Sequence, residues 1–190
     1  MNSYKLIVYQ LTRPVSYLFI KHADKYIYDW VVPFVLLVVS AILMIIFSAS
    51  VFEIYLLVEK VADFLGSLPG FFIAALAAIA TFNRLDIDKP MAGKNPPKVE
   101  TLVNTQYLEV ELSRRRFLCM LFSFLTMQSI ILSVFGFLPE VFGFYSKDNM
   151  VMNISAFASI SFLLIYFFFA FQLLAATMHG MYYLGDRIHY

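Results

Sequence analysis

Residues 117–139 read FLCMLFSFLTMQSIILSVFGFLP and contain no Asp, Glu, Lys or Arg. A helix needs about 20 consecutive apolar residues to cross the hydrocarbon core of a bilayer, so this stretch is long enough to span. Three further stretches of comparable length are equally free of charge: Trp30–Phe52, Phe64–Asn83 and Asn149–Thr177. The sequence therefore predicts an integral membrane protein with four spans.

The composition agrees with this class. Hydrophobic residues make up 61% of the chain, charged residues 14%, and the mean hydropathy is +0.77. Soluble domains are nearer to about 45–50% apolar and about 25% charged. Four spans use roughly half the chain and leave no loop large enough for an independent soluble domain. We predict an all-α fold, a polytopic bundle of four transmembrane helices that forms a single membrane domain.

The basic residues predict the orientation of the spans. Twelve of the fourteen lie before the first span, between the second and third, or after the fourth, and the exceptions are Lys60 and Lys147. Lys and Arg concentrate in cytoplasmic segments. Both termini and the middle loop are therefore predicted to be cytoplasmic.

The predicted segments follow from these boundaries. In chain order they are an amphipathic N-terminus (1–30), span one (31–52), an outer interfacial segment (53–66), span two (67–83), a cytoplasmic loop and stalk (84–116), span three (117–138), an outer loop (139–153), span four (154–178) and a tail (179–190). The N-terminus is expected to be an interfacial helix broken or started at Pro14, or else a helix that binds a partner.

The middle loop is the one sizeable polar segment. Apolar residues in its second half recur at helical spacing, and no helix breaker separates them from span three. We therefore predict one helix from Val99 through Leu138, whose first turns project into the cytoplasm as a stalk. An exposed apolar stripe needs a cover, so these residues are candidates for partner binding: Val99, Leu102, Val103, Tyr107 and Val110.

Two further groups of residues suggest contacts. Arg114, Arg115 and Arg116 fall where span three enters the bilayer and are predicted to bind lipid headgroups. Small or polar residues inside the spans are predicted to serve helix packing or oligomer contacts: Gln128, Ser129, Ser133, Ser155, Ser159 and Gln172. The two amides could bond within the bundle, across subunits or to water in a pore.

The sequence offers little chemistry. No ionisable residue is predicted within a span core, and such residues usually mark ion or proton pathways. The three histidines flank membrane ends, Cys119 is the only cysteine, and no catalytic or phosphate-binding motif occurs. We therefore expect a protein that is not an enzyme and has no cofactor and no metal site.

In size, four-span layout, orientation and the basic entry to span three at 114–117, the chain resembles the membrane component of the Kiwa anti-phage defence system. The resemblance implies a homo-oligomer, a tetramer, in the bacterial inner membrane, with a cytoplasmic partner that binds DNA. The expected function is a membrane sensor and anchor that oligomerises and recruits this soluble partner in antiviral defence, without binding nucleic acid itself. The alternative is an oligomeric pore that perturbs the membrane potential.

Overall fold

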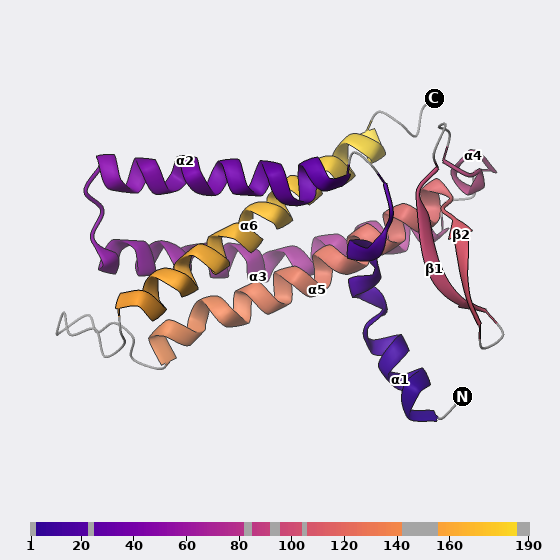
Figure 1. Ribbon diagram of the computed structural model, residues 1–190, viewed down its shortest axis with the longest axis horizontal. Helices are drawn as coiled ribbons and strands as arrows, with labels where there is room; N and C mark the ends of the chain where they lie inside the picture. Colours follow the sequence, from indigo (N-terminus) through magenta and orange to yellow (C-terminus); the bar gives the residue numbers. More distant parts are fainter. Residues whose placement is uncertain are drawn as a thin grey trace.

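The computed structural model describes residues 3–22, 25–81, 85–91, 96–103, 106–141 and 156–185. Its main feature is four helices long and apolar enough to cross a membrane: Ile27–Ile46, Val51–Thr81, Arg114–Val141 and Phe157–Gly185. They run side by side along the longest axis of the molecule (Figure 1). The prediction of a mostly helical chain with four apolar helices is confirmed.

The first of these helices begins earlier than the charge-free stretch suggested. A π-helical turn, η2 (Ile27–Val31), leads directly into α2 (Val32–Ile46). The predicted start at residue 31 is therefore wrong, and so is the end at residue 52, because α2 ends at Ile46 and Ser48 beyond it has a positive φ of 51°. The earlier start places one carboxylate, Asp29, inside the helix.

The second helix, α3 (Val51–Thr81), is continuous, so the predicted division into an outer interfacial segment and a separate span is wrong. Its start is closed by Ser50 and Glu53, which form the reciprocal hydrogen bonds of a capping box. Gly66 does not break the helix. A Cβ at Gly66 would lie 2.8 Å from the Ser133 hydroxyl, so the glycine provides close packing between helices rather than a turn.

The predicted stalk is wrong. Residues 98–111 form an antiparallel hairpin of β1 (Lys98–Val103) and β2 (Gln106–Glu111), in which Lys98 pairs with Glu111. The pattern of residues 98–111, in which valines and other β-branched residues alternate with glutamates, fits a strand as well as a helix. The packing of Val99 into the core favours the strand. The third long helix, α5 (Arg114–Val141), starts only after the hairpin, where the Ser113 hydroxyl accepts the backbone N–H of Arg116 at 3.3 Å.

The N-terminal residues pack beside this hairpin. The helix α1 (Ser3–Leu11) ends before Pro14, as predicted, and the 3₁₀ helix η1 (Arg13–Phe19) follows. Backbone hydrogen bonds then join Lys21 to Lys98 of β1. We call α1, η1 and the hairpin the platform. Figure 1 shows the platform at one end of the bundle, with α1 directed across the bundle axis.

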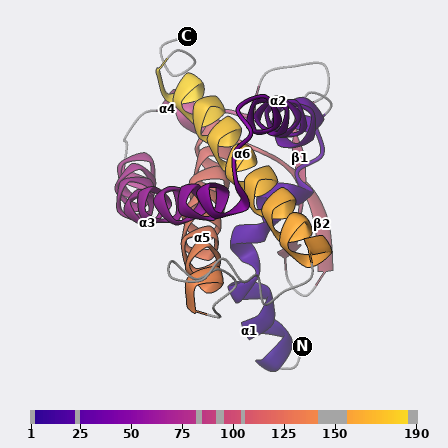
Figure 2. The same cartoon turned by 90° about the vertical axis from the view of Figure 1, so that its left-hand side faces the viewer.

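The bundle consists of two close pairs of helices. The helix α3 packs along α5, and the last helix, α6 (Ala156–Gly185), packs against both α2 and α5. Viewed along the bundle, α6 crosses diagonally between α2 and α5 (Figure 2). A short helix, α4 (Leu85–Asp88), contacts α5 near the platform. The helix α6 continues to Gly185, so the first residues of the predicted tail from residue 179 are helical.

Candidate functional site

The structure contains an ion pair buried between the platform and the bundle. Lys25 and Asp29 lie four residues apart at the entry to α2, and their side chains form a salt bridge. Asp29 is 1% exposed and Lys25 is 8% exposed. One turn of helix brings the two groups to the same face. Charges removed from water are tolerated only when they are paired and hydrogen-bonded, so these two side chains depend on each other.

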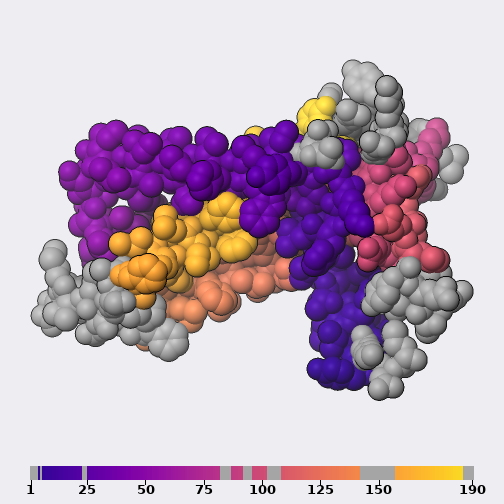
Figure 3. All heavy atoms as spheres, viewed as in Figure 1, coloured from indigo at the N-terminus to yellow at the C-terminus, as the bar shows by residue number. Residues whose placement is uncertain are grey.

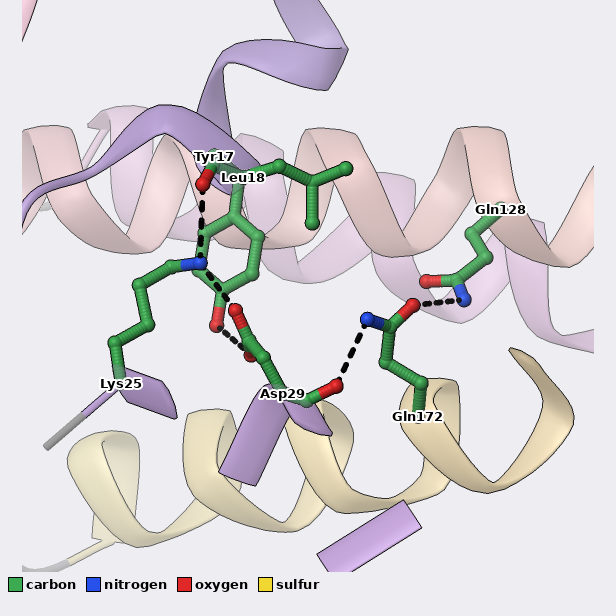
Figure 4. Close-up of polar contacts among 6 residues, drawn as sticks. All are labelled: Tyr17, Leu18, Lys25, Asp29, Gln128 and Gln172. Atoms are coloured by element: carbon green, nitrogen blue, oxygen red, sulfur yellow. Dashed lines mark hydrogen bonds and ion pairs between the residues drawn. The ribbon is translucent and has the colours of Figure 1, made fainter. Parts of the chain in front are cut away.

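Tyr17 of η1 completes this cluster (Figure 4). Its hydroxyl donates to the Asp29 Oδ1 at 3.1 Å, and the Lys25 ammonium lies 4.3 Å from the centre of its ring. The ammonium also donates to the Leu18 carbonyl at 3.5 Å. Burial and the neighbouring Asp29 carboxylate raise the pKa of Tyr17 well above its usual range, so the hydroxyl keeps its proton as a donor. We call Tyr17, Lys25 and Asp29 the buried polar cluster.

A chain of amides extends this cluster into the bundle. The Gln172 amide nitrogen donates to the Asp29 carbonyl at 3.0 Å, and the Gln172 oxygen accepts from Gln128 at 3.0 Å. In a regular helix the donor to the Asp29 carbonyl would be the N–H of residue 33, which is a proline and has none. Gln172 therefore supplies the donor that Pro33 lacks. Gln128 also donates to the Phe169 carbonyl at 3.0 Å.

Aromatic rings cover the cluster on its α6 side. His179 stacks on Tyr28 with ring centres 4.1 Å apart, and it meets Phe117 and Tyr183 edge-on at 6.1 and 4.9 Å. A cavity of about 20 Å³ remains between these rings and Lys25, room for about one water molecule. His179 thus packs inside an aromatic group at the platform end of the bundle.

The hairpin is attached to η1 by exposed charges as well as by the backbone. The Lys21 ammonium lies 2.5 Å from a Glu109 oxygen and 3.5 Å from a Glu100 oxygen. The hydrogen bond from Lys21 lowers the pKa of the Glu109 carboxyl, and the same bond raises the pKa of Lys21. Exposed ion pairs of this kind contribute little to the free energy of folding, so they orient the hairpin relative to η1 and add little to its stability.

The residues predicted to bind a partner do not share a helical face, because that helix does not form. Val99 is 1% exposed and belongs to the protein's own core, and Val110 is half-buried on β2. The backbones of Leu102, Val103 and Tyr107 lie in the hairpin, and their side chains are outside the described part of the structure. The basis for the predicted stripe is therefore removed.

The three arginines at the start of α5 have different surroundings. Arg115 forms a bidentate pair with Asp88, at 2.6 and 3.1 Å, and donates to the Ile79 and Ala80 carbonyls at the end of α3. Arg116 donates to the Thr101 hydroxyl of β1 at 2.6 Å, and Arg114 is half-buried. Arg115 therefore joins α3, α4 and α5. The predicted role in binding lipid headgroups remains a prediction for all three.

Most of the small and polar residues predicted for helix packing make their contacts within one chain. The Ser133 hydroxyl donates to the Ala62 carbonyl of α3 at 3.0 Å, and Ser129 is buried and donates to the Thr126 carbonyl at 2.9 Å. Ser159 is buried, and its hydroxyl has no hydrogen-bond partner among the described residues. Ser155 lies outside the described residues. Gln128 and Gln172 bond to each other within one chain.

Two features were not predicted from the sequence: the buried polar cluster, and the α3 side of the contact between α3 and α5. Asp29 lies one residue before a charge-free stretch, and Lys25 stands at i−4 from it, a spacing that could have indicated an ion pair. On α3, Ala62 and Gly66 form a small-xxx-small pair that meets Ser133 and Gly136 of α5. Across the described residues, no group of three or more His, Cys, Asp or Glu could hold a metal ion.

Comparison of the chain with protein-family models, with curated proteins and with solved structures finds no match. The fold and the contacts above are therefore the basis for any function. They describe a chain with four candidate membrane spans and a platform at one end of them.

Proposed function

We propose that the chain is a non-enzymatic membrane anchor and sensor, which oligomerises in the inner membrane and recruits a soluble partner at its cytoplasmic face. The four apolar helices support the membrane location, and the platform, which lies at one end of them, supplies a surface at which a partner can dock. The distribution of Lys and Arg supports a cytoplasmic location for the platform under the positive-inside rule.

The observation that carries the proposal is an apolar stripe on α1. Tyr4, Ile7, Val8 and Leu11 recur at i, i+3, i+4 and i+7, which places them on one face of the helix. All four are exposed, Tyr4 to 75% and Leu11 to 74%. A contiguous exposed apolar face at the end of a polar platform is typical of an interaction site. We therefore assign the α1 stripe as the surface that binds the partner.

The attachment of the platform to the spans supports a sensing role. Tyr17 of η1 packs between Phe117 and Phe124 of α5, with ring centres 6.2 and 5.1 Å away, and its hydroxyl binds Asp29 at the entry to α2. Asp29 in turn binds α6 through Gln172. A shift of α2 or α6 in the bilayer would thus reach η1 through buried contacts, and α1 directly precedes η1 in the chain.

The resemblance to the Kiwa membrane component extends this proposal. It supplies the biological setting, antiviral defence, together with a DNA-binding partner and a tetrameric assembly. The alternative of an oligomeric pore has less support, since three of the polar side chains in the spans form hydrogen bonds within one chain. Gln128 and Gln172 are buried against each other, and the Ser133 hydroxyl is bonded to α3.

The test is co-purification from membranes. The chain is co-expressed with the product of its neighbouring gene, extracted in mild detergent and captured through a tag, and companion proteins are identified. Retention should be lost on substituting Tyr4→Ser and Leu11→Ser together. The matched control changes two equally exposed apolar residues far from the platform, Phe47→Ser and Val141→Ser, which are 78% and 75% exposed. Recovery of no companion, or equal retention by both double variants, would contradict the proposal.

A further inference from the structure

We propose that Arg13 and Arg116 together bind the phosphate group of an anionic ligand, at the groove between the N-terminal segment and the hairpin. This site is separate from the α1 stripe, because the two arginines come from η1 and from the first turn of α5. In the space-filling view the indigo N-terminal segment lies directly against the pink hairpin (Figure 3). The inference does not depend on the function proposed above.

The two guanidinium groups converge on one hydroxyl. The Thr101 Oγ1 of β1 accepts from the Arg13 Nη2 at 3.3 Å and from the Arg116 Nη2 at 2.6 Å. Because both nitrogens bind the same oxygen, the Arg13 Nη2 and the Arg116 Nη2 cannot be further apart than the sum of these two distances. Two like charges held this close repel each other, and a single hydroxyl carries no charge to offset them. The arrangement is one that a bound anion would stabilise.

Neither arginine has a carboxylate partner among the described residues, whereas their neighbours do. Lys21 pairs with Glu109, and Arg115 pairs with Asp88. The Glu100 carboxylate lines the same groove, but it lies 3.5 Å from the Lys21 ammonium. The contacts seen for Arg13 and Arg116 are the shared hydroxyl and, for Arg13, the face of the Tyr9 ring at 5.3 Å. A guanidinium carries five N–H donors, so most of theirs remain available.

The groove is large enough to hold a phosphate ester. Its volume is about 530 Å³, and Arg13 lines it together with the apolar side chains of Val15, Phe19 and Val99. Arg116 and Thr101 do not line the groove, and Arg116 approaches Arg13 through the Thr101 hydroxyl that both arginines bind. Arginine binds phosphate oxygens with two parallel hydrogen bonds, and a pair of arginines can hold one phosphate from two sides. Arg116 stands in the first turn of a candidate span, which is where the phosphate of a phospholipid would lie. A soluble phosphate ester has the same chemistry.

The test measures anion binding by the full-length protein in a zwitterionic detergent. Native mass spectrometry follows titration with phosphatidylglycerol, with phosphatidylcholine as the lipid of neutral headgroup, and inorganic phosphate is added in a separate arm. The variants are Arg13→Gln, Arg116→Gln and the double variant. The control is Lys60→Gln, which removes one exposed positive charge from α3.

Each single variant should weaken binding of the anion about tenfold, the loss of about 1.4 kcal/mol expected for a charge-assisted hydrogen bond. Because both arginines hold one phosphate, the double variant should lower the affinity for the anion by much less than the product of the two single effects. Thr101→Val, which removes no charge, should also weaken binding and serves if an arginine variant fails to fold. If only the binding of phosphatidylglycerol depends on Arg13 and Arg116, the ligand is a lipid headgroup. If the binding of inorganic phosphate depends on them as well, the ligand is a soluble phosphate. An equal loss in Lys60→Gln, losses that multiply, or equal binding of phosphatidylcholine would overturn the proposal.

Discussion

Replacement of Asp29 by asparagine should destabilise the protein strongly. The substitution keeps the size of the side chain but removes the negative charge that neutralises Lys25, which is 8% exposed. Breaking a buried ion pair by removing one partner costs about 3–5 kcal/mol, because the remaining charge stays buried without compensation. Lys25 retains the Leu18 carbonyl and the face of the Tyr17 ring as partners. We therefore expect a loss near the lower end, about 3 kcal/mol.

The assay is equilibrium unfolding of the purified protein in detergent micelles or nanodiscs. The matched control is Asp63→Asn on the exposed side of α3, which should change the free energy of unfolding by less than about 0.5 kcal/mol. Replacing both partners, with Lys25→Met and Asp29→Leu together, should restore most of the stability, since apolar pairs of similar volume substitute well for buried ion pairs. An Asp29→Asn protein as stable as the unchanged chain would refute the reasoning, and so would a double variant less stable than the single one.

Three further substitutions or conditions test other contacts. Gly136→Val should destabilise the bundle by about 1–3 kcal/mol, measured by thermal unfolding, because a Cβ there would lie 2.4 Å from a side chain of α3. Gln172→Leu should cost about 1–3 kcal/mol in the same assay, since it leaves the buried Asp29 carbonyl without its donor and removes one of the two acceptors of the Gln128 amide. Because the folded-state pKa of Glu109 is lowered, its pair with Lys21 is intact above the ordinary carboxyl pKa and is lost as the pH falls through the lowered value. Amide hydrogen exchange of the hairpin should therefore be faster at acidic pH than intrinsic rates predict, and Glu109→Gln should abolish this difference.

The four long helices could be predicted because one physical constraint determines them. Hydrocarbon excludes charge, so the length of the charge-free stretches indicates the spans without knowledge of tertiary contacts. The predicted bounds of the spans are less accurate where helix packing overrides the local sequence preference. Glycine has a low helix propensity, but at position 66 it lets α3 approach Ser133 of α5 closely. In a bilayer, such close approach replaces the hydrophobic effect as the basis of helix association.

The hairpin and the buried polar cluster could not be predicted with the same rule. Residues 98–111 carry apolar side chains at spacings that fit both a strand and a helix, and burial of Val99 beneath η1 distinguishes the two. The cluster joins Tyr17, Lys25 and Asp29 through tertiary contacts that spacing indicates only for the last two. Gln128 and Gln172 were correctly recognised as amides that need partners, while the sequence left open whether those partners lie within one chain.

If the α1 stripe on the platform recruits a cytoplasmic partner, as we propose, substitutions in the stripe should weaken the affinity of the purified protein for that partner. The unchanged chain and the Tyr4→Ser, Leu11→Ser variant are each co-expressed with the neighbouring gene product, reconstituted in nanodiscs and titrated with the purified companion, and the dissociation constant is measured. The account predicts binding to the unchanged chain and at least tenfold weaker binding to the variant, with no change for the Phe47→Ser, Val141→Ser control. Equal affinity for all three proteins, or no binding to any of them, would contradict it.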